Sequence, residues 1–400
     1  MISIGIDVSK GKSTVFAANE DGTVFIGSAE YEHTAQDMGR LAEQVCLLPG
    51  EVKVLMESTG HYHWPIVSKL LEHQIFVSIV NPLTINHFSK RSVRPGKTDK
   101  KDAVTICRYG LAYWNESKPC SPSAKEYSKL QTLSRQHYCY TALKVKLKVN
   151  LSELLDKVFP DIQKLLQDAQ GRSKLSEFVT TYWHADLVSG QTEEAFCQAY
   201  VTWAKEKGYR RNESKAREIY AVSQNGIPTL PCTEATKLLV QTAAAALQEI
   251  ETAVDIILAQ MDRIASTLPE YTTVIAMKGV GKNICSRLIA EIGDVSRFHN
   301  AHALVAYTGI DAAPYQSGQY ERPHNHISKR GNKYLRKIGF EIMSSLMSNK
   351  PTEDNAVYQF MVKKRSEGKH YLSSYMVGLN KFLRIYYARV KPIILQSQNN

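Results

Sequence analysis

The order of strand and helix patterns in the first 80 residues constrains the fold of this chain more than any other feature. Strand patterns cover residues 2–7, 12–18, 22–28, 52–57 and 75–80, and helical patterns cover residues 33–47 and 61–72. The turn Asn19-Glu20-Asp21-Gly22 joins the second and third strands as a hairpin, whereas Asn81-Pro82 closes the fifth. Hairpins make antiparallel neighbours, and strands that follow a helix usually pair in parallel. The order therefore predicts a mixed sheet covered by helices.

Carboxylates occur where these strands end. Asp7 ends the first strand, Glu57 ends the fourth, and Asp99 and Asp102 open a helix after the fifth. The last two are three residues apart, so they project from one face of that helix. Strand ends of an open sheet gather at one edge, and we expect the four acids to converge there. Their repulsion would be severe without a cation, so convergence predicts Mg²⁺ or Mn²⁺. A solvated first turn that simply favours acids is the alternative for Asp99 and Asp102.

This ordered set resembles the RuvC-like domain of the DEDD transposases. The matching segments are Asp7, Glu57-Ser58-Thr59-Gly60-His61-Tyr62, Asn81-Pro82 and Lys97-Thr98-Asp99-Lys100-Lys101-Asp102-Ala103. These transposases are insertion-sequence recombinases related to the Piv invertases, and the family includes members guided by a bridge RNA. The resemblance implies an RNase H-like fold and metal-dependent DNA strand exchange, with all four acids as catalytic metal ligands.

The charge of the chain favours a polyanionic partner. With 50 basic and 39 acidic residues the net charge is +11, and no stretch is apolar enough to span a bilayer. Nucleic acid is therefore expected before any membrane. The first residues read as a strand rather than a secretion signal, and the seven cysteines form no Cys-x-x-Cys pair. We expect a reducing compartment. The resemblance implies the bacterial cytoplasm, with the protein associated with the nucleoid.

A basic stretch, residues 90–101, leads directly into the acids. We expect Arg94, Lys97, Lys100 and Lys101 to hold a phosphate backbone against the metal site. Simple solubility is the alternative explanation for these charges.

Two long helical patterns, residues 123–158 and 233–268, occupy the middle of the chain. They predict an antiparallel coiled coil or a subunit contact. Residues 161–232 between them are helical and loop-rich and carry no catalytic signal. We therefore expect a RuvC-like α/β domain over residues 1–122, a helical coiled-coil region with an insertion over 123–268, and a mainly α C-terminal transposase domain over 269–400.

A glycine turn opens the last domain. Residues 274–292 read as an apolar helix, a Gly-x-Gly turn at Gly279 and Gly281, and a second helix. A helix-hairpin-helix-like element of this kind binds DNA phosphate through its turn. An ordinary glycine-containing helical turn explains the pattern equally well. The tail over residues 355–391 reads as helical and basic.

The segments that follow resemble the second conserved domain of the same transposases. They are Gly293-Asp294-Val295-Ser296-Arg297-Phe298, Ala306-Tyr307-Thr308-Gly309-Ile310, Gln316-Ser317-Gly318 and residues 327–337. The family's nucleophilic serine lies in a Ser-Gly pair in this interval, and Ser317 matches it. Ser328 is the competing hydroxyl, but it belongs to Ser328-Lys329-Arg330-Gly331-Asn332, which fits the family's basic motif. We expect Lys329, Arg330, Lys333 and Arg336 to neutralise phosphate.

The resemblance implies a transposase that acts as the site-specific recombinase of its own insertion sequence. It implies cleavage and rejoining of donor and target DNA through a phosphoserine at Ser317, a guide (bridge) RNA, and a homo-oligomer, a tetramer. Two rivals fit the same residues. A hydrolytic RuvC-like nuclease, such as a junction resolvase, would use the four acids with water as the nucleophile. A non-catalytic nucleic-acid-binding protein would use the acids only to cap strands and helices.

Overall fold

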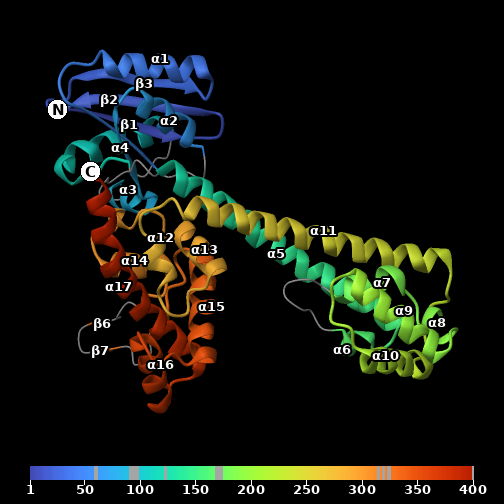
Figure 1. The fold of residues 1–400 in the computed structure, drawn as a ribbon. Helices are drawn as coiled ribbons and strands as arrows, with labels where there is room; N and C mark the ends of the chain where they lie inside the picture. Colours follow the sequence, from blue (N-terminus) through green and yellow to red (C-terminus); the bar gives the residue numbers. More distant parts are fainter. Residues whose placement is uncertain are drawn as a thin grey trace. The chain divides into compact units, whose positions relative to one another are not determined.

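The computed structural model describes residues 1–57, 62–89, 99–120, 124–166, 174–312, 316–317, 320–321 and 326–398. The chain divides into two compact units, residues 1–124 and 125–400 (Figure 1). The finer boundaries expected after residues 122 and 268 stay predictions.

The first unit is built on a five-stranded sheet with the strand order β3-β2-β1-β4-β5. The first three strands pair antiparallel, and β4 and β5 continue the sheet parallel to β1. The predicted mixed sheet is therefore confirmed. Its elements are β1 (Ile2–Val8), β2 (Lys12–Asn19), β3 (Val24–Glu32), α1 (Ala35–Cys46), β4 (Val52–Glu57), α2 (Trp64–Glu72), β5 (Phe76–Val80), α3 (Pro82–Ser89), α4 (Asp99–Ala112) and the 3₁₀ turn η1 (Trp114–Glu116).

Two elements differ from the sequence expectation. Strand β3 runs past Ser28 to Glu32, because one extra residue forms a bulge beside Ser28, whose φ is +40°. Helix α3 is absent from the sequence expectation, in which Asn81-Pro82 closes β5. Proline fits the first turn of a helix, where its missing N–H has no partner to lose, so Pro82 begins α3 instead.

Two long helices run through the second unit, α5 (Ala124–Val158) and α11 (Glu234–Ala265). They lie antiparallel, since Leu130 shares a core with Met261 whereas Leu155 shares another with Leu247 (Figure 1). An ion pair of 3.0 Å between Lys144 Nζ and Glu251 Oε1 joins them midway. The predicted antiparallel pairing within the chain is confirmed, and a subunit contact through these helices stays a prediction.

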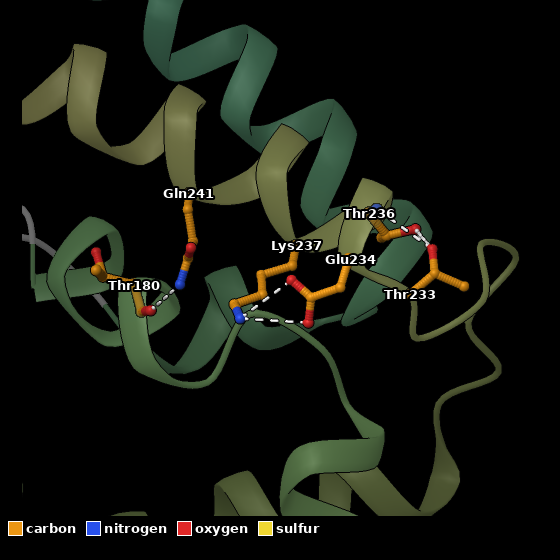
Figure 2. A network of polar contacts seen from close by, with 6 residues as sticks. All are labelled: Thr180, Thr233, Glu234, Thr236, Lys237 and Gln241. Carbon is orange, nitrogen blue, oxygen red and sulfur yellow. Dashed lines mark hydrogen bonds and ion pairs between the residues drawn. The ribbon is translucent and has the colours of Figure 1, made fainter.

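Short helices fill the region between these two. They are α6 (Ile162–Leu165), α7 (Lys174–Thr181), α8 (Asp186–Ser189), α9 (Glu193–Glu206) and α10 (Glu213–Asn225). Figure 2 shows how α7 is tied to α11: Gln241 Nε2 donates to the Thr180 carbonyl at 2.8 Å. Thr233 caps α11 by accepting from the Thr236 N–H. This region is thus a helical extension of the coiled coil with a core of its own.

The rest of the second unit is mainly helical, as predicted. Its elements are α12 (Tyr271–Ile275), α13 (Lys282–Ile292), η2 (Val295–Arg297), α14 (Ala301–Thr308), β6 (Gln316–Ser317), β7 (Tyr320–Glu321), α15 (Lys333–Asn349), α16 (Ala356–Ser366) and α17 (Tyr371–Gln398). The helical tail is present as α16 and α17, whereas the two-residue strands β6 and β7 were not expected. Among the helices that the structure describes, none combines the length and apolarity needed to cross a bilayer.

Candidate active site

Strand register brings two of the predicted acids together. Strands β1 and β4 run parallel with Ile6 opposite Met56. The next residue of each strand is a predicted metal ligand, so Asp7 and Glu57 stand beside each other at the carboxyl ends of adjacent strands.

Alternation along the strands sets the face on which these two side chains lie. Ile6 and Met56 are fully buried in the core that α1 and α2 form on one face of the sheet. Successive side chains point to opposite faces, so Asp7 and Glu57 project from the other face. Both are partly exposed there.

Helix α4 covers that other face, and glycines let it approach closely. A Cβ at Gly5 would lie 2.2 Å from the Ala103 carbonyl oxygen and 2.3 Å from the Cys107 nitrogen, and one at Gly110 would lie 2.2 Å from Ser3 Oγ. The helix therefore runs antiparallel to β1. Its first turn, which holds Asp99 and Asp102, stands at the end of β1 that carries Asp7.

A cation from β2 lies at the same end of the sheet. Lys12 Nζ is 3.0 Å from Glu30 Oε2. This hydrogen bond and the charge of Glu30 raise the pKa of Lys12, and the negative charge of Asp99 adds to the increase. Asp99 is thus within electrostatic reach of the start of β2.

The donor set fits a hard divalent cation. Carboxylate oxygens are the ligands that Mg²⁺ and Mn²⁺ prefer, and four carboxylates meet one edge of the sheet. Among the described residues, which include all four acids, no three of these carboxylates have oxygens within 4.8 Å of one another. Like charges repel, and coordination at about 2.1 Å from Mg²⁺ would draw the oxygens closer.

Only part of the basic stretch, residues 90–101, lies within the described residues. Lys100 and Lys101 lie exposed on the first turn of α4. Arg94 and Lys97 lie outside the described residues.

The two candidate serines lie in the second unit. Ser317 is in β6, where it pairs with Tyr320 of β7, and its side chain is outside the described part of the structure. Ser328 Oγ donates to Asp311 Oδ1 at 2.7 Å and accepts from the Arg330 N–H at 3.3 Å. The Ser328 hydroxyl therefore holds its own loop in place.

The basic motif after Ser328 divides into two groups of side chains. Lys329, Arg330 and Lys333 are exposed. Arg336, by contrast, donates from Nη1 to the Thr308 carbonyl at 2.8 Å, so its guanidinium also joins α15 to the end of α14.

Asn332 has a role that sequence reasoning missed. Its Oδ1 caps α15 by accepting from the N–H groups of Tyr334 and Leu335 at 2.9 and 3.0 Å. Its Nδ2 donates to Oε2 of the fully buried Glu291 at 2.9 Å. An asparagine just before a helical pattern is a recognisable cap signal, but Glu291 is 41 residues away and gave no signal.

In the glycine turn before α13, close packing explains one of the two glycines. Gly279 has a φ of +84°, and a Cβ there would lie 2.7 Å from Leu346 Cγ of α15. Gly281 caps α13 and has open space around its Cα. Contact of this turn with DNA stays a prediction.

Comparisons with known proteins agree with this architecture. Residues 4–160 match the IS110 DEDD family described as "Transposase", and residues 271–359 match the family described as "Transposase IS116/IS110/IS902 family". Together the two matches cover more than half of the chain.

Two similar proteins span nearly the full length. The "Insertion element IS116 uncharacterized 44.8 kDa protein" of Streptomyces clavuligerus is 22% identical over 92% of this chain and 89% of its own. The "Pilin gene-inverting protein" of Moraxella bovis is 22% identical over 84% of this chain and 80% of its own. Among solved structures, Thermus thermophilus RuvC in complex with a Holliday junction substrate matches 30% of this chain and 99% of RuvC, at 14% identity and a TM-score of 0.24.

The chain belongs to the IS110 family of DEDD transposases and is an enzyme of DNA transposition and recombination.

Proposed function

We propose that Asp7, Glu57, Asp99 and Asp102 hold Mg²⁺ or Mn²⁺ and that Ser317 is the nucleophile of strand exchange. The observation that carries this proposal is the register of β1 against β4, with α4 packed across Gly5. It directs four carboxylates from distant parts of the sequence to one edge of one sheet.

Each group then has a chemical task. Held by the four carboxylates, a divalent cation would neutralise charge at the scissile phosphate and lower the pKa of a hydroxyl in contact with it. Ser317 Oγ attacks phosphorus, a P–O bond to the DNA breaks, and the serine proton passes to the departing DNA oxygen. A DNA hydroxyl next attacks the phosphoserine, which restores Ser317 and joins new strands. The ester keeps the bond energy, so no ATP is consumed.

Further parts of the proposal concern partners. Donor and target DNA bind along Arg94, Lys97, Lys100 and Lys101 before the acids, and along Lys329, Arg330, Lys333 and Arg336 after Ser317. The turn at Gly279 and Gly281 contributes main-chain N–H groups to phosphate. A guide RNA pairs with both DNA partners, and a tetramer lets the two half-sites meet between subunits.

Trapping of the covalent intermediate tests the nucleophile. Purified protein, DNA of the insertion-sequence ends and the co-purifying RNA are incubated with Mg²⁺, and protein–DNA adducts are separated under denaturing conditions. The adduct is expected with wild type and with Ser328→Ala, and is expected to be absent with Ser317→Ala. An adduct that survives Ser317→Ala refutes the assignment of the nucleophile.

The products of the same reaction separate recombinase from nuclease. Rejoined recombinant strands support strand transfer, whereas nicked ends without an adduct support a hydrolytic RuvC-like enzyme. Asp102→Asn is expected to abolish metal-dependent activity, and full activity in that variant would remove the metal-site proposal.

A further inference from the structure

A cavity of about 50 Å³ lies in the second unit between α5, α13 and α15. Its polar lining includes Ser134, His137, Arg287, Lys337 and Glu341, none of which belongs to the site described above. The volume suits a few water molecules or one group the size of a phosphate.

His137 lines this cavity and is only 7% exposed. No residue in the described part of the structure forms a hydrogen bond with its imidazole ring, whose nitrogens are not closed off from the cavity. A ligand atom in the cavity can therefore reach the ring and form a hydrogen bond with it.

The charges around the cavity favour an anion. Arg287 is paired with Glu341 at 2.8 Å, and Lys337 Nζ lies 4.5 Å from the centre of the Tyr138 ring. On the rim, Arg135 and Lys333 lie 5.4 and 5.1 Å from the centre of the Tyr334 ring. Ser134, another lining residue, donates a hydrogen bond to the buried Glu291. Two cations, Arg287 and Lys337, therefore line the cavity, two more lie beside the Tyr334 ring, and the lining carboxylate of Glu341 is already paired.

Two tyrosines form the outer edge. Tyr138 and Tyr334 contact each other edge to face, with ring centres 4.9 Å apart. Tyr138 is 36% exposed, so part of its side chain faces solvent. Cations beside exposed aromatic rings are the combination that binds single-stranded nucleic acid, because bases stack on the rings while the backbone follows the charges.

We infer that this pocket binds one unpaired nucleotide of a single-stranded nucleic acid, with its phosphate held by Lys337, Arg287 and His137 and its base against Tyr138. The base is unpaired because the faces of a base inside a duplex are already covered by its neighbours. The inference rests on the proposed function for the source of the strand, since a guide RNA and a DNA strand opened during exchange offer the same chemistry.

Binding without catalysis tests the pocket. The full-length protein is titrated, in buffer with a chelator, into fluorescent single-stranded RNA, single-stranded DNA of the same sequence, and the corresponding duplex. Tyr138→Ala is expected to weaken single-strand binding about tenfold or more and to leave duplex binding unchanged. Tyr138→Phe, which keeps the ring, and Tyr371→Ala, which removes another exposed tyrosine, are expected to bind like wild type. The relative losses of affinity for RNA and for DNA identify which nucleic acid supplies the single strand.

Lys337→Gln gives an independent measurement. Loss of one phosphate contact is expected to reduce the slope of log K against log salt by about 0.7 for a single strand. Lys237→Gln, which removes a half-exposed lysine of α11, serves as the control. Unchanged single-strand affinity in Tyr138→Ala overturns the inference, and so does an equal loss on duplex DNA. Single-strand binding is measured in the presence of a chelator and needs no strand cleavage, so failure of the catalytic proposal and failure of this pocket give different results.

Discussion

The carboxylate edge of the first unit and the α14–α15 junction of the second unit use their motif residues in different ways. At the sheet edge, the glycines and the strand register position the backbone that carries the acidic side chains. At the junction, Asn332 and Arg336 of the motif itself hold the fold together, whereas Lys329, Arg330 and Lys333 are exposed. Some residues of a sequence motif can therefore serve activity while others stabilise the fold. Substitutions of the first kind should lower activity, and substitutions of the second kind should lower stability.

The largest difference is expected for Glu57→Gln. Loss of one metal-binding carboxylate should lower strand cleavage roughly a thousandfold, about 4 kcal/mol, because phosphate charge is no longer neutralised in the transition state. Stability should change by less than about 1 kcal/mol, since the amide has the same shape and removes repulsion with Asp7. Cleavage kinetics and thermal unfolding of the same preparation check both parts. Near-normal cleavage would show that this edge is not the catalytic site.

Gly5→Ala tests the scaffold beneath the acids. The new Cβ would overlap the main chain of Ala103 and Cys107, so α4 must move, at a cost of about 3 kcal/mol in the free energy of unfolding. Cleavage should fall as well, because α4 carries Asp99 and Asp102. Gly39→Ala in α1 is the matched control: nothing lies within 4 Å of its Cβ, and a small gain in stability is expected. Urea unfolding measures both variants, and a harmless Gly5→Ala would contradict the described packing.

Asn332→Ala should show the opposite profile to Glu57→Gln. It removes the cap of α15 and leaves the buried Glu291 carboxylate short of a donor, which together cost about 2 to 3 kcal/mol. Asn332→Ser keeps an oxygen for the cap and should recover part of the loss. Chemical denaturation measures this series. If Asn332→Ala unfolds like wild type but binds DNA poorly, the residue belongs with the exposed side chains of the motif.

The smallest effect concerns pH and belongs to the second unit alone. Burial, and then the charges of Arg287 and Lys337, lower the pKa of His137 to about 4. The unfolded chain therefore binds this proton more readily, and stability should fall by about 2 kcal/mol as the pH drops from about 6.5 toward 4.

His137→Gln isolates this contribution. Burial raises the pKa of Glu270, which acts with the opposite sign because it stabilises the folded state at low pH and loses that effect as the pH rises. We therefore compare the free energy of unfolding of wild type with that of His137→Gln, measured by denaturant unfolding from pH 7 to pH 4. A constant difference over that range would show that His137 keeps its usual pKa.

Local patterns in the sequence determined a good deal about this protein. Alternation and turn residues predicted the mixed sheet, because side-chain period and loop chemistry are local properties. The spacing of the apolar residues predicted the long helices α5 and α11 for the same reason. The order of Asp7, Glu57, Asp99 and Asp102 pointed to the family, since a metal site needs the same residue types wherever the chain places them.

Only the tertiary structure decided how these pieces relate. The sequence could say that Asp7 and Glu57 end strands, but the pairing of β1 with β4, its register and the close approach of α4 at Gly5 are seen only in the tertiary structure. It read Arg336 as a phosphate ligand without the Thr308 carbonyl that also binds it, and it contained no sign of the cavity around His137. Each of these depends on residues dozens of positions apart, whose contacts form only when hydrophobic burial brings distant elements together.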